Sequence, residues 1–390
     1  MQVSSQPAKG PGPAETLTGA ARQMGSFWDR VSDGLGMQTL WSQFFSEARS
    51  SYALYKHEIN WEALNKQKGA RRFFRLSRLL FWAMLMKLSP ARRVFLLLIL
   101  LFLAFYLLNI RPANVPRPAE FLMAIGGLVF LLALELADRV TMKRDLEIAR
   151  EIQHWLVPQS PPRVPGVDIA FSSRPANTVG GDYYDAFLLD PAAASPASQR
   201  LLLVVADVAG KSVPAALLMA TFHASLRTAA VTAPPLAELV ARLNDYTCAH
   251  SLGGGRFTTA FFADFDPLRR ELTYIRAGHN APLLRRASGE VERLEEGDLP
   301  LGIRPNVHFP SGTARLAPGD LLVIFTDGVI EAVNEHDQEF GESRLLDLVR
   351  VTSVESASET LGRLNSTIAA FAGSTRQHDD ITWLLMRVER

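Results

Sequence analysis

An uncharged apolar run is the feature that most constrains how this chain can fold. It extends from Val94 to Ile110, 17 residues without a charged side chain. A helix needs about 17–25 apolar residues to cross the hydrocarbon core of a bilayer. A buried helix of a soluble protein usually keeps a polar face, and this run has none. The run therefore predicts a transmembrane helix.

A second apolar stretch follows after a short connection broken by prolines. It runs from Phe121 to Leu134 and continues through Leu136 and Ala137. Its Gly126 and Gly127 suit close helix packing in lipid. We interpret residues 93–137 as a two-helix transmembrane hairpin. Arginine and lysine are more abundant before the first span and after the second than between them, so both termini are expected in the cytoplasm.

The region before the hairpin divides by composition. Residues 1–25 are rich in Pro, Gly, Ala and Ser, which predicts a disordered tail. Residues 26–92 predict a cytoplasmic or interfacial helical region. Its basic segment Arg71–Leu88 fits a helix lying on the membrane surface, or equally an amphipathic helix packed on a neighbour. The net charge of +1 favours no nucleic-acid partner, and the single cysteine excludes an intrachain disulfide.

Residues 138–160 predict a linker helix that leaves the membrane. Ile148, Ile152 and Trp155 recur at helical spacing and form an apolar stripe, and Pro158 ends the pattern. Such a stripe can pair with a second copy of the chain and give a homodimer. It can also pack on the chain's own C-terminal domain, and the sequence leaves both alternatives open.

Residues 161–390 predict a separate domain of mixed strands and helices. Strands are expected at Val167–Ser173, Tyr183–Leu189, Leu201–Ala206, Thr258–Phe265, Glu271–Ala277, Leu321–Thr326 and Ile381–Val388. Helices are expected at Pro214–Ala230, Leu236–His250, Glu342–Val351 and Ala357–Phe371. The strands come in runs with helices between the runs, which indicates an α+β fold rather than a regular alternation.

Carboxylates occur where apolar strands begin or end. Asp207 follows Leu201–Ala206, Asp327 follows Leu321–Thr326, Asp182 follows a Gly-Gly pair, and Asp379-Asp380 precede the last strand. Carboxylates gathered at the end of a sheet repel one another and lose hydration, so a bound cation would stabilise them. Oxygen ligands without nearby His or Cys favour Mg²⁺ or Mn²⁺. Adjacent strand residues face opposite ways, so Asp379 and Asp380 are not both expected to bind an ion.

At these residues the chain resembles a known family. The motifs that carry the resemblance are Val179–Asp185, Asp207–Ala216, Phe257–Thr259, Ala277–Pro282, Pro300–Gly302, Thr326–Ala332 and Asp379–Thr382. In this order they are similar to those of the PPM-type metal-dependent protein phosphatases, in the bacterial branch typified by stage II sporulation protein E. The resemblance covers roughly Glu147–Arg387. It departs at Ser212, where the family commonly has glycine.

The resemblance implies a four-layer α/β/β/α sandwich and hydrolysis of phosphoserine or phosphothreonine by a water activated between two Mn²⁺ or Mg²⁺ ions. It implies that Asp207 bridges both ions, that Asp182 and the Val208 carbonyl complete one site, and that Asp327 and Asp379 complete the other. Asp185, Lys211 and Asp380 would lie just outside these ligands. In a bacterium the hairpin would anchor the enzyme in the inner membrane. The implied substrate is a phosphoprotein, for example an anti-sigma-factor antagonist of a partner-switching circuit.

Several alternatives stay open at this stage. The domain could be a catalytically silent module that binds a phosphoprotein, although such modules usually lack some of the metal aspartates. Asp185 could be a hydrogen-bond acceptor at a strand edge, and Lys211 could be simply solvated. His279 could be a general acid, but a hydrogen-bonded turn residue is the favoured interpretation.

Overall fold

The computed structural model describes residues 82, 85, 86, 88–108, 117–189, 199–250, 256–352 and 356–389. The predicted tail and almost all of the region 26–92, including nearly all of Arg71–Leu88, lie outside the described residues. The chain divides into two compact units, Met1–Leu136 and Ala137–Arg390. Each unit is described here by itself.

The first unit contains two apolar helices, the second of which continues past Leu136 into the other unit. Helix α5 spans Pro90–Leu108, and helix α6 spans Arg117–Leu156. A side chain added at Gly127 would lie 2.8 Å from Ile99, and the rings of Phe95 and Phe130 meet edge to face at 5.8 Å. Both helices are long and apolar enough to cross a membrane. The second apolar stretch and the linker, which the sequence separated, form one helix of 40 residues, because no proline or cap interrupts the helical pattern between them.

The second unit is built on two mainly antiparallel sheets. One has the order β1-β11-β10-β6-β7, with bounds β1 Val167–Arg174, β11 Ile381–Val388, β10 Leu321–Phe325, β6 Leu283–Arg285 and β7 Val291–Arg293. The other has the order β2-β3-β4-β5-β8, with β9 also paired to β5. Its bounds are β2 Tyr183–Leu189, β3 Arg200–Val208, β4 Thr258–Asp266, β5 Glu271–Ala277, β8 Gly297–Asp298 and β9 Gly312–Arg315.

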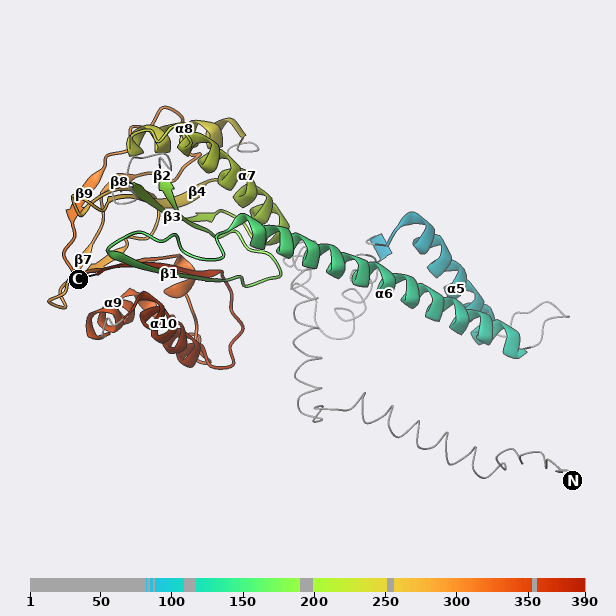
Figure 1. The fold of residues 1–390 in the computed structure, drawn as a ribbon. Helices are drawn as coiled ribbons and strands as arrows, with labels where there is room; N and C mark the ends of the chain where they lie inside the picture. The colour runs from blue at the N-terminus through green and yellow to red at the C-terminus, as the bar shows by residue number, and fades with distance from the viewer. Residues whose placement is uncertain are drawn as a thin grey trace, which may run out of the picture. The chain divides into compact units, whose positions relative to one another are not determined.

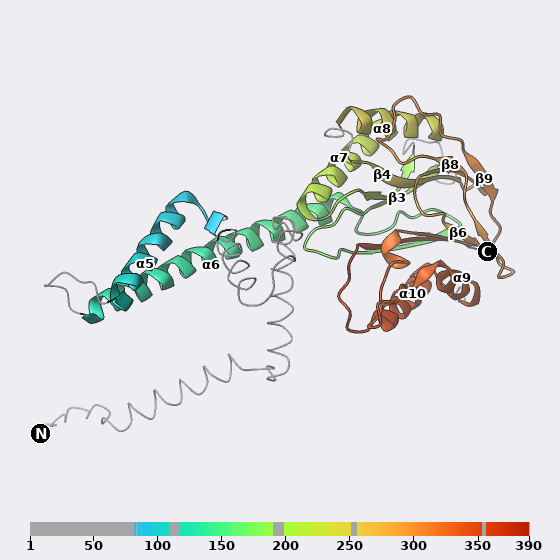
Figure 2. The same cartoon turned by 180° about the vertical axis from the view of Figure 1, so that it is seen from behind.

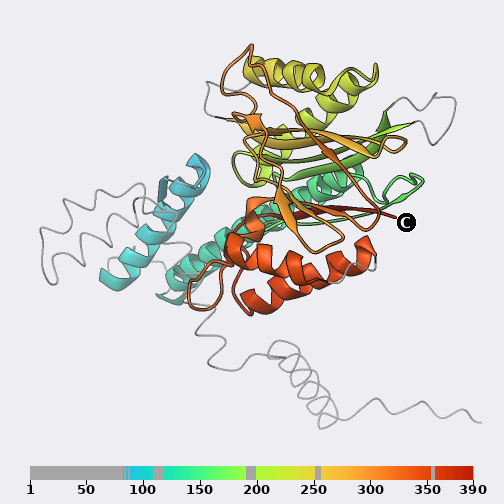
Figure 3. The ribbon, with the colours of Figure 1, turned by 90° about the vertical axis from the view of Figure 1, so that its left-hand side faces the viewer.

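Helices cover the outer face of each sheet (Figure 1). Helices α7 (Ser212–Ala230) and α8 (Leu236–His250) lie on the β2–β5 sheet. Helices α9 (Gly341–Val351) and α10 (Ala357–Ala372) lie on the β1-β11-β10 sheet, as the view from behind also shows (Figure 2). The order of layers is therefore helix, sheet, sheet, helix, which Figure 3 shows from the side. The predicted four-layer α/β/β/α fold is confirmed.

Strand β3 shows why its sequence is apolar without interruption. Leu201, Leu203 and Val205 face the other sheet. Leu202, Val204 and Ala206, which alternate with them, face α7 and α8. Because both faces of the strand are covered, an alternating polar pattern would leave unpaired polar groups in one of the two cores. The predicted longer strands and the four helices of this domain agree with the structure to within two residues at each end.

Candidate metal-binding site

Asp207 and Asp327 come from different sheets. Asp207 is the second-last residue of β3, and Asp327 begins the short 3-10 helix Asp327–Val329 directly after β10 and Thr326. Strand β10 pairs with β11 in one sheet, while β3 lies between β2 and β4 in the other. The closed sandwich brings the ends of these two strands to one edge, where burial and then the charge of Asp327 raise the pKa of Asp207.

Asp182 joins the same edge from the loop before β2. Its side chain is 8% exposed, and the hydroxyl of Thr326 donates a hydrogen bond of 2.9 Å to its Oδ2 atom. The Thr326 hydroxyl also accepts a hydrogen bond of 3.0 Å from the Thr382 backbone amide. A single threonine thus connects the loop of Asp182 with the strands that carry Asp327 and Asp379.

Asp379 and Asp380 have different surroundings. The Asp380 carboxylate accepts hydrogen bonds of 2.7 Å from the backbone amides of Ala176 and Gly181, so it holds the loop that leads to Asp182. The Asp379 carboxylate is one-third exposed and pairs with Lys211 at 2.8 Å. This difference favours Asp379 as the ion ligand and Asp380 as the support of the loop.

The electrostatics of the cluster are those of crowded, partly desolvated carboxylates. Burial, followed by the charges of Asp327 and Asp379, raises the pKa of Asp207 to about 7. Burial and then Asp207 raise the pKa of Asp182 well above its ordinary value. Burial and then Asp379 raise the pKa of Asp327. Repulsion of this kind is relieved by protons or by a cation.

The donor set fits a hard divalent cation, but the side chains are spread apart. All of its members are oxygen donors, and a side chain at Gly181 would meet the Val208 carbonyl oxygen at 2.9 Å, so glycine leaves that oxygen open. Within the described ranges, no three His, Cys, Asp or Glu side chains are grouped closely enough to hold an ion as they stand. Asp182 is engaged by Thr326, and Asp379 by Lys211. An ion bound by the Oδ2 atom of Asp379 would compete with Lys211 for that oxygen.

Asp185 faces away from this cluster. It is fully buried, and both of its oxygens accept hydrogen bonds of 2.8 Å from the guanidinium of Arg227 in α7. The Tyr183 hydroxyl and the Ala186 amide donate to the same carboxylate. Of the two sequence alternatives, Asp185 is therefore the hydrogen-bond acceptor, and it ties β2 to α7.

His279 is a buried structural residue. It is 3% exposed, and its Nδ1 atom lies 3.1 Å from the Thr259 hydroxyl. Burial lowers its pKa to about 4, so the ring is neutral near pH 7. A neutral imidazole in this position has no exposed acidic proton to give to a leaving group, and the structure supports the turn residue favoured from the sequence.

Residues that the sequence did not single out also touch the site. The Gln153 side chain of α6 makes two hydrogen bonds with the Gly180 backbone, accepting at 3.1 Å and donating at 2.8 Å. Glu331 has a pKa raised by burial and then by Asp327 and Asp379. Arg227 and Gln153 lie dozens of residues from their partners, so no local pattern could reveal them. Glu331 lies within the third motif and could have been noted there.

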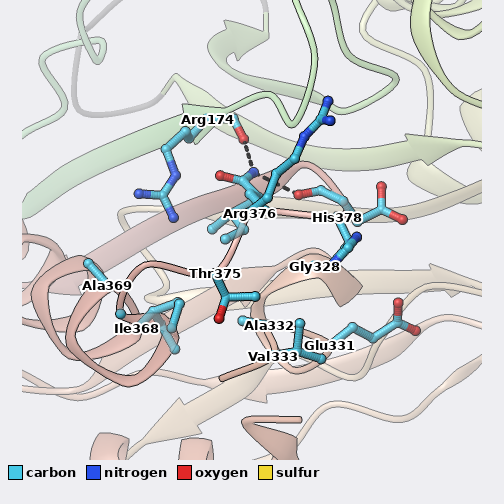
Figure 4. A pocket seen from close by; sticks show the side chains of 15 residues that line it. Arg174, Gly328, Glu331, Ala332, Val333, Ile368, Ala369, Thr375, Arg376 and His378 are labelled. Carbon is cyan, nitrogen blue, oxygen red and sulfur yellow. Dashed lines mark hydrogen bonds between the residues drawn. The ribbon is translucent and has the colours of Figure 1, made fainter. Parts of the chain in front are cut away.

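A pocket of about 210 Å³ adjoins the cluster at Asp379 and Gly328. Figure 4 shows Arg174 and Arg376 on one side of it, with Glu331 and Val333 on the other. Arg174, Arg376 and His378 are exposed. The pocket leaves room beside the aspartates for part of a larger molecule.

Three comparisons bear on this site. The family model described as stage II sporulation protein E matches residues 197–389. Protein IcfG of Synechocystis is 28% identical over 65% of this chain and 43% of its own length. Phosphoserine phosphatase RsbU of Bacillus subtilis is 27% identical over 63% of this chain and 70% of its own length. The chain thus spans less than half of the first of these relatives.

The fold also matches solved structures. The SiaA-PP2C domain of Pseudomonas aeruginosa superposes with a TM-score of 0.57 at 24% identity, over 65% of this chain and 99% of that domain. The likeness shows a PP2C-like fold for the C-terminal unit.

Proposed function

Residues 197–389 of this chain match the stage II sporulation protein E family, and from this match we propose that the chain is a metal-dependent protein phosphatase acting on phosphoserine or phosphothreonine. The observation that supports this most is the meeting of Asp207 and Asp327 from opposite sheets, with Asp207 at a pKa of about 7. The family relative RsbU is named a phosphoserine phosphatase.

The residues have separate tasks in this proposal. Asp207 would bridge two ions, Asp182 and the Val208 carbonyl would complete one site, and Asp327 and Asp379 the other. Two bound Mn²⁺ or Mg²⁺ ions would supply Lewis-acid chemistry and lower the pKa of water. Thr326 orients Asp182 by its hydrogen bond of 2.9 Å, and Asp380 fixes the Ala176–Gly181 loop through two backbone amides.

The pocket beside Asp379 is large enough to bind part of the proposed protein substrate. A phosphorylated protein segment needs room on both sides of its phosphoserine, and the 210 Å³ pocket opens directly beside the cluster. Its exposed Arg174 and Arg376 favour acidic residues next to the phosphoserine. The proposed substrate is a phosphoprotein of a bacterial partner-switching circuit, such as an anti-sigma-factor antagonist.

We place the enzyme at the inner membrane. The two apolar helices have the length and hydropathy of membrane spans. Arg92, near the start of α5, pairs at 3.3 Å with Glu135, near the end of the apolar part of α6. The positive-inside rule then puts both termini, and the aspartate cluster, in the cytoplasm. Reporter fusions to the C-terminus that work only in the cytoplasm should be active, and fusions within 111–116 should not.

The linker supports a homodimer as the second part of the proposal. Trp155 is 77% exposed, and Ile148 and Ile152 are about half exposed, so these three side chains remain accessible to a partner helix. Apolar stripes of this kind are buried when two helices pair. Sedimentation of the compact unit 137–390 should show a dimer, and Ile152→Asp should give a monomer. A monomeric wild-type unit would contradict this part.

Activity is tested with p-nitrophenyl phosphate and a phosphoserine peptide flanked by acidic residues, with Mn²⁺ added. Wild type should hydrolyse both, and Asp327→Asn should hydrolyse neither. Asp337→Asn is a matched control, because Asp337 is an exposed turn residue with a φ of 57° that asparagine adopts readily. Equal hydrolysis by wild type and Asp327→Asn would refute the proposal. Peptide binding by a protein that binds Mn²⁺ but never hydrolyses would instead favour the silent binding module.

A further inference from the structure

The Lys211 side chain connects the loop after β3, in one sheet, with the residues just before β11, in the other sheet. It lies between β3 and α7, after Gly210 with a φ of 122° and before Ser212 with a φ of 60°. Its Nζ atom donates hydrogen bonds of 2.8 Å to the Asp379 carboxylate and 2.9 Å to the His378 carbonyl. Asp379 is separated from it by 168 positions in the sequence. The contact therefore depends on the closed sandwich.

The Lys211 ammonium pairs directly with one carboxylate of the aspartate cluster, that of Asp379, at 2.8 Å. It counteracts the raised pKa of both Asp207 and Asp327. No arginine whose contacts the structure describes pairs with Asp182, Asp207, Asp327 or Asp379. The side chain is 56% exposed, so its flexible four-carbon stem can move once the two hydrogen bonds of Nζ are released.

The start of α7 adds to the positive character of this place. Lys211 is the N-cap residue of the helix and adopts an extended backbone conformation, and no side chain caps the first turn. The positive end of a 19-residue helix thus lies next to the ammonium. Both features attract an anion with more than one oxygen, as a phosphoryl group has.

We propose that Lys211 is a ligand of the substrate's phosphoryl group, held by Asp379 until that carboxylate turns to a bound cation. The inference rests on the phosphatase proposal and names a residue for a task that the sequence left unassigned. In the state described here the ammonium neutralises Asp379. When Asp379 ligates a cation instead, its charge is satisfied, and the ammonium beside it is available to a phosphoryl oxygen. The site then exchanges one ion pair for another, and both charges stay paired.

This role differs from that of a strut between two loops. If Lys211 competes with the cation for Asp379, its removal strengthens Mn²⁺ binding while it weakens phosphate binding. If it only braces the loops, its removal weakens Mn²⁺ binding or changes neither. The affinities for Mn²⁺ and for phosphate therefore change in opposite directions only if Lys211 binds the phosphoryl group.

The experiment uses the full-length chain in detergent micelles. Calorimetry gives the Kd for Mn²⁺, and inhibition of p-nitrophenyl phosphate hydrolysis at saturating Mn²⁺ gives the inhibition constant of inorganic phosphate. The variants are Lys211→Met, which keeps length without charge, and Lys211→Arg, which keeps the charge. Lys143→Met is the matched control, because Lys143 is exposed on α6 and pairs weakly with Glu147 at 4.0 Å.

For Lys211→Met we expect the Kd for Mn²⁺ to fall about threefold and the phosphate constant to rise about tenfold, the effect of one charge-assisted hydrogen bond. Lys211→Arg should keep most of the phosphate affinity, and Lys143→Met should match wild type in both. A phosphate constant within twofold of wild type in Lys211→Met, or weaker Mn²⁺ binding, overturns the inference alone. Wild-type protein that binds no Mn²⁺ overturns the phosphatase proposal as well.

Discussion

The start of β2 and the start of β11 each carry two aspartates, and the two regions neutralise them differently. At β2, Asp182 faces the cluster and Asp185 faces Arg227, whose guanidinium supplies a full positive charge. At β11, Asp379 faces the cluster and Asp380 is held only by two neutral amides. The charge of Asp185 is cancelled where it lies, whereas Asp380 raises the pKa of Asp182 and Asp207. Similar pairs of residues thus stabilise the fold in one region and increase the demand for a cation in the other.

The largest effect is expected from Asp207→Asn. Substitution of residues one step removed from a metal commonly lowers affinity about 10- to 100-fold, so loss of a bridging carboxylate should lower Mn²⁺ affinity by more than about 100-fold. Without Mn²⁺, the same variant should melt at a higher temperature than wild type at pH 7.5, because a repelled carboxylate is gone. Calorimetry measures the Mn²⁺ affinity, and thermal unfolding measures the melting temperature. A variant that melts at a lower temperature than wild type without metal would contradict the repulsion among the aspartates.

The second prediction concerns pH. The folded protein keeps a proton on Asp207 up to about pH 7, while the unfolded chain releases it near the ordinary pKa of 3.8. The folded state therefore binds more protons in this window, and the metal-free unfolding free energy should fall as pH rises through it. The contribution of Asp207 is at most about 4 kcal/mol. Urea unfolding in chelator at pH 5 and 7.5 should show a steeper fall for wild type than for Asp207→Asn; equal slopes would contradict the prediction.

The comparison is tested next at β2 with Arg227→Met. Removing one partner of a buried pair commonly destabilises a protein by 3–5 kcal/mol, and because Arg227 is 40% exposed we expect about 3 kcal/mol. Arg350→Met, which breaks an exposed pair with Asp347, is the control and should change stability by less than about 1 kcal/mol. The double variant Arg227→Met with Asp185→Asn should recover part of the loss. If Arg227→Met lowered the stability no more than Arg350→Met does, the buried Asp185 carboxylate would not need the guanidinium for its stabilisation.

The smallest effect is expected at the loop after β3. Ser212 has a φ of 60°, the left-handed conformation that disfavours residues with a Cβ atom by roughly 1–2 kcal/mol. Ser212→Gly should therefore stabilise the protein by about 1 kcal/mol. Gly210→Ser is the opposite test, because Gly210 has a φ of 122° that side chains rarely adopt. Urea unfolding gives the unfolding free energy of both variants and of wild type, and Gly210→Ser should lower it. A lower unfolding free energy for Ser212→Gly would contradict backbone strain at Ser212.

The sequence predicted what local patterns encode. The uninterrupted apolar run of β3 predicts a strand covered on both faces, and the residues before Pro158 predict the end of α6. Strands β6 to β9 have two to four residues each and show no periodicity, so they were not predicted. The pairs Asp185–Arg227 and Lys211–Asp379 were also not predictable, because their members are 42 and 168 positions apart and only the folded sandwich brings them together. The Ser212 departure was visible in the sequence, and the structure supplied its backbone angle.

The position of β11 within its sheet has a consequence for biosynthesis. This last strand, Ile381–Val388, lies between β1 and β10, so it pairs with one strand made early and another made late. The ribosome must have released residues 381–388 before that gap can be filled. Asp379 lies two residues before the first residue of the strand, Ile381, and β10, which leads to Asp327, lacks one neighbour until the strand is in place. A growing chain that has not yet reached β11 therefore lacks a complete aspartate cluster, and any activity that depends on the cluster begins only after this strand has been made and paired.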